Sequence, residues 1–392
     1  MKLLRVIPES MLRGKKVFVR CDFNVPLENG KVKDDTRIKK ALPTMEYLIE
    51  KGAKITLASH LGRPKGEKKP DLSLLPVAKR LSELLEKDVE FAEDCIGDEV
   101  SKKIEALSEG DVLLLENLRF YKGEEKNDED FAKSLATPFD VYINDAFGTA
   151  HRKHASTYGM AKYFNVKGAG FLLEKEVHML TEILENPEKP FVVILGGAKV
   201  KDKIGIIENL LDRADVFVIG GGMAYTFLKA TGKKIGNSLF DEKHFDKVKE
   251  FLEKGKEKFV LPVDHVVVSS LSDLSDLREV EEIEEGYMGV DIGRKTIRLF
   301  EEKIKNAKTI FWNGPMGVFE KNELAKGTVE IAKSVRDATG MGAKTVIGGG
   351  DTVSAIHVAR LHDEDFTHVS TGGGATLEFL AGIKLPGIEA LE

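Results

Sequence analysis

Short apolar runs rich in β-branched residues alternate with amphipathic segments along the whole chain, and this alternation constrains the fold more than any other feature. The runs cover 17–23, 54–59, 111–117 and 141–147 in the first half, and 191–195, 216–219, 309–312, 344–347 and 367–370 in the second. The segments between them have helical spacing, as where Ile38, Ala41 and Met45 share one face. Strands that alternate with helices predict parallel sheets covered on both faces. We therefore predict an α/β protein with two Rossmann-like, doubly wound parallel-sheet domains.

The length of the chain supports two domains. A chain of 392 residues with 42% hydrophobic content exceeds what one core usually organises. Residues 171–185 have the spacing of one long amphipathic helix, flanked by the turn-rich stretches 167–170 and 186–190. We predict that this interdomain helix joins a first domain, 1–168, to a second that begins at 169, with a cleft between them. The polar, acidic segment 269–286 is interpreted as a solvated loop or hairpin.

Charge and cysteine content exclude several classes of protein. The net charge of −6 gives no global basic field, so we expect neither nucleic-acid nor membrane binding. Cys21 and Cys95 have no ligand-like spacing, which argues against a disulfide scaffold and a zinc site. The start lacks the apolar region of a signal peptide, and no apolar run reaches membrane-spanning length. We expect a cytoplasmic protein.

Cationic and polar residues follow the predicted strands of the first half. Parallel strands end at the same edge of a sheet, so these residues should converge there. A single arginine is normally a solvated surface group, but repetition at one edge predicts a local cationic basin. Guanidinium groups match carboxylate and phosphate oxygens, which suggests a small, multiply anionic hydroxy acid as ligand. The residues are Arg20, Asp22, Asn24, Arg37, His60, Arg63, Arg119 and Arg152. His151 and His154 are assigned hydrogen-bonding roles rather than a metal site, because no acidic or thiol ligand lies beside them in the sequence.

Four strand–glycine–helix turns mark the second half, at 195–203, 219–227, 347–355 and 370–379. Such turns suit phosphate binding because glycine admits a close backbone approach and a helix start offers free N–H groups. Lys199 and Lys203 lie one helical turn apart, and Asp351 with Thr352 opens a helix where the carboxylate could meet magnesium. Neither GxGxxG nor GxxxxGK[ST] occurs, which disfavours a dinucleotide dehydrogenase and a Walker NTPase.

Nine motifs, in order along essentially the whole chain, resemble those of the phosphoglycerate kinase family. They are RCDFNVP, DDTRI, SHLGRPKG, ENLRF, NDAFGTAHR, GGAKVKDKI, WNGPMGVFE, GGGDT and STGGGATLEF. The resemblance implies two lobes, the first for 3-phosphoglycerate and the second, up to residue 374, for the nucleotide, with 375–392 returning to the first. It also implies reversible in-line transfer of the acyl phosphate of 1,3-bisphosphoglycerate to ADP with hinge-bending domain closure and Mg²⁺ as cofactor. We expect a monomer. Cys21 and Arg294 depart from the family pattern, at positions not expected to touch the reacting atoms.

The resemblance also assigns residues to roles. The acid-phosphate site would use Arg20, Asp22, Phe23, Asn24, Arg37, His60, Leu61, Gly62, Arg63, Arg119 and Arg152. The nucleotide site would use Gly196, Lys199, Lys203, Gly289, Asn313, Glu320, Gly349, Gly350, Asp351 and Thr352, with Asp351 on the metal. The migrating phosphoryl would be stabilised by Arg37, Lys199, Lys203, Gly372, Gly373 and Gly374.

Two alternatives remain open at this stage. One is an NAD-dependent hydroxy-acid oxidoreductase on a similar framework, and the other is a non-catalytic phosphometabolite-binding protein. The intact set of Arg37, Lys203 and Asp351 argues against a decayed site.

Overall fold

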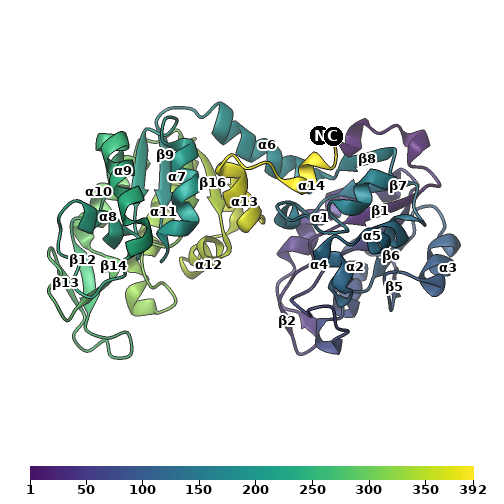
Figure 1. Ribbon diagram of the computed structural model, residues 1–392, viewed down its shortest axis with the longest axis horizontal. Coiled ribbons are helices and arrows are strands. Elements are labelled where there is room, and N and C mark those ends of the chain that lie inside the picture. Colours follow the sequence, from purple (N-terminus) through teal and green to yellow (C-terminus); the bar gives the residue numbers. More distant parts are fainter. The chain divides into compact units, whose positions relative to one another are not determined.

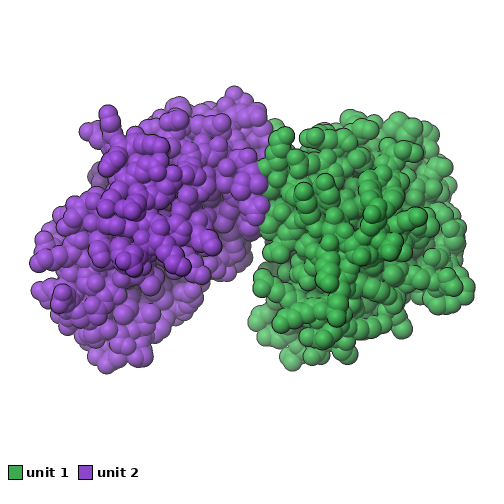
Figure 2. Space-filling model, viewed as in Figure 1, with its two compact units in different colours: residues 1–178, 384–392 green, residues 179–383 purple.

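A computed structural model describes residues 1–392, which form two compact units (Figures 1 and 2). Unit 1 comprises Met1–His178 and Lys384–Glu392, and unit 2 comprises Met179–Ile383. Helix α6 (Phe171–Glu185) begins in unit 1 and ends in unit 2. The units divide later in the chain than the expected 168 and 374, because the first turns of α6 bond within unit 1 and α13 (Gly374–Leu380) packs on α7 (Ile204–Leu210) in unit 2.

Unit 1 is built on a six-stranded parallel sheet in the order β5-β6-β4-β1-β7-β8. Its central strands are buried along nearly their whole length, as expected where helices cover both faces. The strands are β1 (Lys16–Arg20), β4 (Lys54–Ala58), β5 (Val89–Ala92), β6 (Val112–Leu115), β7 (Val141–Asn144) and β8 (Val166–Ala169). The helices are α1 (Thr36–Glu50), α2 (Leu75–Leu85), α3 (Asp98–Ala106), α4 (Lys122–Lys126), α5 (Glu129–Ala136) and α14 (Pro386–Glu389). A small ribbon pairs β2 (Leu27–Glu28) with β3 (Lys31–Val32).

Unit 2 repeats the design with a parallel sheet in the order β11-β10-β9-β15-β16-β17. Its strands are β9 (Phe191–Leu195), β10 (Val216–Ile219), β11 (Phe259–Val260), β15 (Thr309–Asn313), β16 (Lys344–Gly348) and β17 (His368–Val369). Besides α7 and α13, its helices are α8 (Ala224–Ala230), α9 (Phe245–Gly255), α10 (Arg294–Lys305), α11 (Lys326–Gly340) and α12 (Gly350–Val358). Helices α10 and α11 pack side by side (Figure 1). The predicted fold class of two doubly wound parallel-sheet domains is confirmed.

Two local predictions are corrected. Several predicted strands are shorter, since β1 ends at Arg20 and the polar residues that follow leave the sheet. Residues 167–169, predicted as part of a turn, belong to edge strand β8. The interpretation of 269–286 as a solvated hairpin is confirmed, because β13 (Arg278–Val280) pairs antiparallel with β12 (His265–Val268), and β14 (Met288–Ile292) completes this small sheet. The short strands at sheet edges were not predicted because they contain charged residues and are too short to show a clear alternation of apolar and polar residues.

Both termini lie in unit 1. The Lys2 amide donates to the Leu391 carbonyl at 3.3 Å, and the two chain ends are adjacent in Figure 1. Among the helices of the chain, none combines the length and apolar character that crossing a lipid bilayer demands.

Candidate functional sites

The cationic residues predicted in the first half gather at the carboxyl edge of the unit 1 sheet. Arg20 ends β1, His60 follows β4, Arg119 lies in the 3₁₀ turn after β6, and Arg152 lies in the turn after β7. The chain leaves β1 toward β4 on one side and returns to β7 on the other, so this edge is a topological switch point, where open α/β sheets bind ligands. We call this group of residues the basic basin.

Hydrogen bonds tie the outer layer of the basic basin together. Arg37, on the first turn of α1, donates from Nη1 to Asp22 Oδ2 at 2.7 Å. The amide of Gly62 donates to Asn24 Oδ1 at 2.8 Å, and Arg119 donates from Nη1 to the Gly62 carbonyl at 2.8 Å. These hydrogen bonds therefore connect four separate chain segments.

An inner layer of the basin is fully buried. Arg20 has no exposed surface and donates from Nε to Ser156 Oγ at 2.7 Å, from Nη1 to the Cys21 carbonyl, and approaches His60 Nδ1 at 3.3 Å from Nη2. Ser156 Oγ lies 2.6 Å from Oε1 of Glu124, a carboxyl that is also fully buried. Arg20 therefore belongs to the buried layer that supports the basic basin. Sequence reasoning missed Glu124 and Ser156 because no spacing links them to the strand ends.

The basin holds its histidines uncharged. Burial, followed by the positive charges of Arg20, Arg119 and Arg37, holds the pKa of His60 well below its usual range. Burial and Arg152 lower the pKa of His151 to about 4. Burial and the neighbouring arginines lower the pKa of His154 to about 3. These imidazoles are therefore uncharged near neutral pH. His151 accepts from Arg152 Nε at its Nε2 at 3.3 Å, whereas Nδ1 of His151 and Nδ1 of His154 are buried without a hydrogen-bond partner.

The remaining predicted residues differ in exposure. Asn24, Arg63 and Arg152 are exposed, whereas Phe23 and Leu61 are buried. Arg119 is largely buried, and its Nε has no hydrogen-bond partner, although Glu125 Oε1 lies 3.5 Å away. A buried donor without a partner is costly, and an anionic ligand beside Arg119 would satisfy it.

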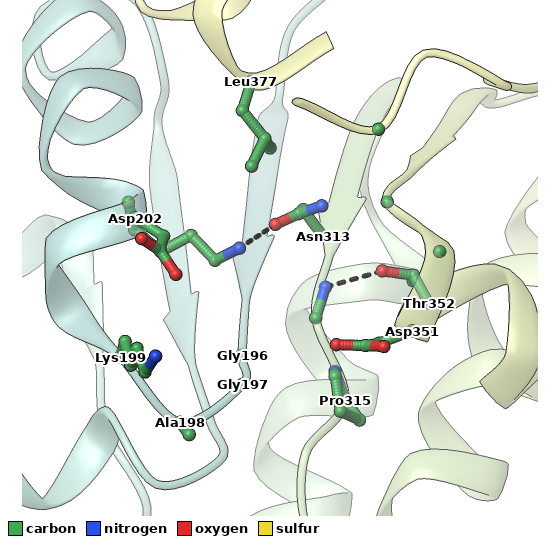
Figure 3. Close-up of a pocket in the computed structure, with 15 residues that line it drawn as sticks. Gly196, Gly197, Ala198, Lys199, Asp202, Asn313, Pro315, Asp351, Thr352 and Leu377 are labelled. Carbon is green, nitrogen blue, oxygen red and sulfur yellow. Dashed lines mark hydrogen bonds between the residues drawn. The ribbon is translucent and has the colours of Figure 1, made fainter. Parts of the chain in front are cut away.

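Unit 2 contains a cavity of about 390 Å³ at its own switch point, between β9 and β15 (Figure 3). Glycines that follow four parallel strands, β9, β15, β16 and β17, form much of its wall. The lining residues are Gly196, Gly197, Ala198, Lys199, Asp202, Lys203, Asn313, Gly314, Pro315, Gly349, Gly350, Asp351, Thr352, Gly373 and Leu377. A polar cavity of this kind suits a phosphate chain.

Lys203 bridges the two halves of the unit 2 sheet. It lies in the 3₁₀ turn Val200–Lys203 that follows β9, and its Nζ donates to Oδ1 of Asn313, the last residue of β15. Asn313 in turn donates from Nδ2 to the Gly348 carbonyl at 2.5 Å. Burial lowers the pKa of Lys203 to about 8, against the opposing pull of the Asp202 and Asp351 carboxylates. Lys203 is thus a poorly solvated cation in the cavity wall.

The backbone segments that line the cavity pack closely against one another. The amide of Gly314 donates to Thr352 Oγ1 at 2.7 Å, and that hydroxyl donates to the Gly348 carbonyl at 2.8 Å. A Cβ atom at Gly196 would lie 2.1 Å from the Pro315 carbonyl oxygen, so only glycine fits there. Gly349 has a φ of +92°, which places the start of α12 against Asn313.

A second cavity of about 230 Å³ adjoins the first and shares Gly197, Ala198, Pro315 and Asp351 with it. The shared residues make the two cavities one continuous surface. Predicted residues Gly289 and Glu320 line the second cavity, together with apolar side chains that include Tyr225, Leu239 and Phe319. The first cavity is thus polar and glycine-rich, and the second offers apolar surface for a flat ring.

Two predicted residues lie apart from these cavity walls. Gly373 lines the first cavity, whereas Gly372 and Gly374 do not. The predicted site residues lacked six lining residues, Gly197, Ala198, Asp202, Gly314, Pro315 and Leu377, although a Gly-Pro pair directly after a strand is a turn signal that could have marked two of them.

The carboxylate of Asp351 fits a magnesium ion that is coordinated mainly by the phosphates of a bound nucleotide and by water. No group of three or more His, Cys, Asp or Glu side chains gathers to hold a metal ion. Asp351, exposed on the first turn of α12, lines both cavities. Magnesium in nucleotide sites usually takes one or two carboxylates, with phosphates and water as the other ligands. A single carboxylate beside a phosphate-sized cavity matches that mode.

Comparison with known proteins points to one family. The family model described as "Phosphoglycerate kinase" matches residues 7–383. A phosphoglycerate kinase of Clostridium botulinum is 54% identical over 392 residues, covering 98% of each chain, and one of Borrelia hermsii is 53% identical, covering 99% of each. The solved structure of phosphoglycerate kinase from Coxiella burnetii has a TM-score of 0.88 at 41% identity, covering 100% of this chain and 99% of that one. The structure from Pyrococcus horikoshii has a TM-score of 0.85 at 35% identity, covering 100% and 98%.

Proposed function

The chain belongs to the phosphoglycerate kinase family, and we propose that its two units divide the reaction of that family between them. It is a phosphotransferase with a carboxyl group as acceptor, and it transfers the acyl phosphate of 1,3-bisphosphoglycerate to ADP, reversibly, giving 3-phosphoglycerate and ATP. In our proposal unit 1 binds the acid phosphate and unit 2 binds the nucleotide. The main support is that each unit has a surface suited to anions at its own switch point, arginine-rich in unit 1 and glycine-lined in unit 2. Membership of this family decides against both alternatives, the oxidoreductase and the non-catalytic binder.

In unit 1, the guanidinium groups of Arg37, Arg63, Arg119 and Arg152 bind the phosphate and carboxylate oxygens of the ligand. Asp22 and Asn24 accept hydrogen bonds from its hydroxyl, and the backbone of Phe23, Leu61 and Gly62 shapes the site. The ion pair between Arg37 and Asp22 supports this assignment, because it holds the flexible arginine at the rim of the basin.

In unit 2, Lys199, Lys203 and the glycine-rich turns at Gly196, Gly349 and Gly350 bind the phosphates. Asn313 and Thr352 lie beside the transferred group, while Gly289 borders the base and Glu320 binds the ribose. The continuity of the two cavities supports this assignment, since a nucleotide needs a polar end and an apolar end on one surface.

Magnesium belongs to the proposal, with Asp351 as its protein ligand. When bound, it would neutralise charge on the nucleotide phosphates. The chain's own contribution is a carboxylate held at the start of α12, next to the cavity that we assign to those phosphates.

In-line phosphoryl transfer needs positioning and charge neutralisation more than a covalent nucleophile. We assign neutralisation of the migrating group to Arg37, Lys199, Lys203 and the turn Gly372–Gly374. Since Arg37 belongs to unit 1 and the others to unit 2, the proposal requires the units to close about their connection when both ligands are bound. Closure would also exclude water from the acyl phosphate. Small-angle scattering should give a smaller radius of gyration with both ligands than with neither.

A magnesium-dependent coupled assay tests the function. Supplied with 3-phosphoglycerate and ATP, the protein should release ADP at a rate that chelation of the metal abolishes. ADP release that does not depend on 3-phosphoglycerate would contradict the proposal.

We also propose that the protein is a monomer of the cytoplasm that binds small molecules and no nucleic acid. Two free, buried cysteines and a net charge of −6 support this setting. Sedimentation velocity would test the monomer, since a dimer would sediment with twice the mass.

A further inference from the structure

Arg20 is a fully buried arginine whose guanidinium is held on every side. Nε donates to Ser156 Oγ at 2.7 Å, Nη1 donates to the Cys21 carbonyl, and Nη2 lies 3.3 Å from His60 Nδ1. Glu124 Oε1 lies 3.9 Å from Nη2 and is also fully buried. Burying a charge this completely is costly unless it is paired and hydrogen-bonded.

Ser156 joins Glu124 to Arg20. Its hydroxyl accepts from Arg20 and lies 2.6 Å from Glu124 Oε1, while its amide donates to Glu124 Oε2 at 3.0 Å. Glu124 is anchored in turn, because its own carbonyl accepts the Ala155 amide at 2.9 Å. Ser156 and Glu124 therefore fix both the position and the plane of the guanidinium.

The contact between Arg20 and His60 determines where the imidazole carries its proton. A guanidinium has only donors, so Nδ1 of His60 must act as the acceptor and carry no hydrogen. Asp22 Oδ1 lies 4.0 Å from the same Nδ1, too far to draw a proton there. The proton of the neutral ring then belongs on Nε2.

We propose that Glu124 and Ser156 are positioning residues that hold Arg20 and, through it, fix His60 as the neutral Nε2–H tautomer. His60 then presents the anionic ligand with a hydrogen-bond donor whose strength does not change with pH. The value of this arrangement for catalysis rests on the proposed function, in which the basic basin binds 3-phosphoglycerate.

Every charged group that faces His60 bears on this assignment. Arg20 from β1, Arg37 from α1 and Arg119 from the turn after β6 disfavour protonation, as does His154 from the segment after β7. Asp22 is the acidic group at the ring, at 4.0 Å. The cations outnumber it, and together with burial they hold the pKa of His60 well below its usual range. Loosening Arg20 would weaken the largest of these charge effects on His60.

The test is ¹⁵N NMR of the full-length protein, with the His60 signals identified by their loss in His60→Gln. Wild type should show the Nε2–H tautomer between about pH 6 and pH 8. In Ser156→Ala the ring should populate both tautomers, and its pKa should rise toward the ordinary value. Near pH 6 the variant's ring would then be partly protonated and bind the anion more tightly. The KM of Ser156→Ala for 3-phosphoglycerate, divided by the wild-type KM at the same pH, should therefore be about threefold lower near pH 6 than near pH 8. The ratio cancels the titration of the substrate itself.

Ser73→Ala is the matched control. Ser73 Oγ donates to Oε2 of the buried Glu116 at 2.7 Å, so this variant loses the same kind of bond in the same unit without touching Arg20. It should leave the His60 tautomer and the KM ratio unchanged. If Ser156→Ala folds poorly, Ser156→Thr offers a second variant. It keeps the hydroxyl and should show the wild-type tautomer.

An Nδ1–H tautomer or an imidazolium in wild type near neutral pH would overturn the proposal. So would an unchanged tautomer and a flat KM ratio in folded Ser156→Ala. Failure of the proposed function looks different, because the tautomer would be as predicted while 3-phosphoglycerate caused no shift of the His60 signals.

Discussion

The two units place their proposed anion-binding surfaces at equivalent points of equivalent sheets but build them from different chemical groups. In unit 1 the positive charge comes from long arginine side chains at the strand ends. In unit 2 much of the cavity wall is glycine backbone, with Lys203 as its buried cation. The first surface depends on side chains held by ion pairs, and the second on main chain held by close packing.

Because of this difference, different substitutions should disrupt the two surfaces. Arginine side chains lose substantial rotamer freedom when they are fixed, so a basin of them needs supporting partners such as Asp22 and Ser156. Backbone N–H groups are already fixed by the fold, so the glycine-lined cavity depends on the absence of Cβ atoms. Four perturbations test the contrast, taken from the largest expected effect to the smallest.

Replacing Lys203 by alanine should give the largest effect. The variant removes the buried cation of the cavity wall, and kcat should fall on the order of 1000-fold, as for other removed transition-state contacts. The thermal midpoint should change little, because burying an ammonium is itself costly. Steady-state kinetics and thermal denaturation measure the two quantities, and full turnover in a folded variant would remove Lys203 from the mechanism.

Replacing Arg37 by alanine should lower kcat/KM for 3-phosphoglycerate about 100-fold, the size of one or two charge-assisted hydrogen bonds. Arg80→Ala is the matched control, because Arg80 donates to Asp35 Oδ2 at 2.6 Å, just before α1. That control should keep wild-type kinetics. Equal losses in both variants would mean that Arg37 acts only by stabilising α1.

Replacing Gly196 by alanine tests the backbone surface without changing any charge. The new Cβ would lie 2.1 Å from the Pro315 carbonyl oxygen, and moving that backbone should destabilise unit 2 by about 1–3 kcal/mol and raise KM for the nucleotide. In Gly340→Ala the added Cβ would meet no atom within 4 Å, so this control should leave KM unchanged. Chemical denaturation and nucleotide titration provide the measurements, and unchanged KM in Gly196→Ala would contradict the close-packing account.

The smallest effect is a pH dependence. As the pH rises through about 8, Lys203 loses its proton, so kcat/KM for ADP should fall several-fold, while Lys203→Arg should not show this fall. The stability of the ligand-free protein should change in the opposite direction. The pKa of Lys203 in the folded state lies below its ordinary value of 10.5, so the unfolded chain binds the extra proton and stability rises with pH between about 8 and 10.5. A constant kcat/KM across this range would remove Lys203 from phosphate binding.

The sequence could predict the sheets and the edges that carry the sites, because apolar runs followed by polar or glycine residues report parallel strands directly. It predicted the gathering of Arg37, His60 and Arg119, since residues after parallel strands share one edge. It could not predict the buried layer of Glu124 and Ser156, because those contacts join segments with no common spacing.

The same limit explains the short strands and the continuity of the two unit 2 cavities. Edge strands such as β8 pair on one side only and need little hydrophobic pattern. The junction of the two cavities at Ala198 and Pro315 depends on how separate turns pack, which local sequence does not encode.

Isothermal titration calorimetry of the full-length protein with each ligand alone tests the division of labour most directly. Arg37→Ala should lose most of its affinity for 3-phosphoglycerate and keep its ADP dissociation constant within about twofold, and Lys203→Ala should do the reverse, because sites that share no residues act independently. If either variant weakened both ligands by the same factor, the two surfaces would not be separate binding sites.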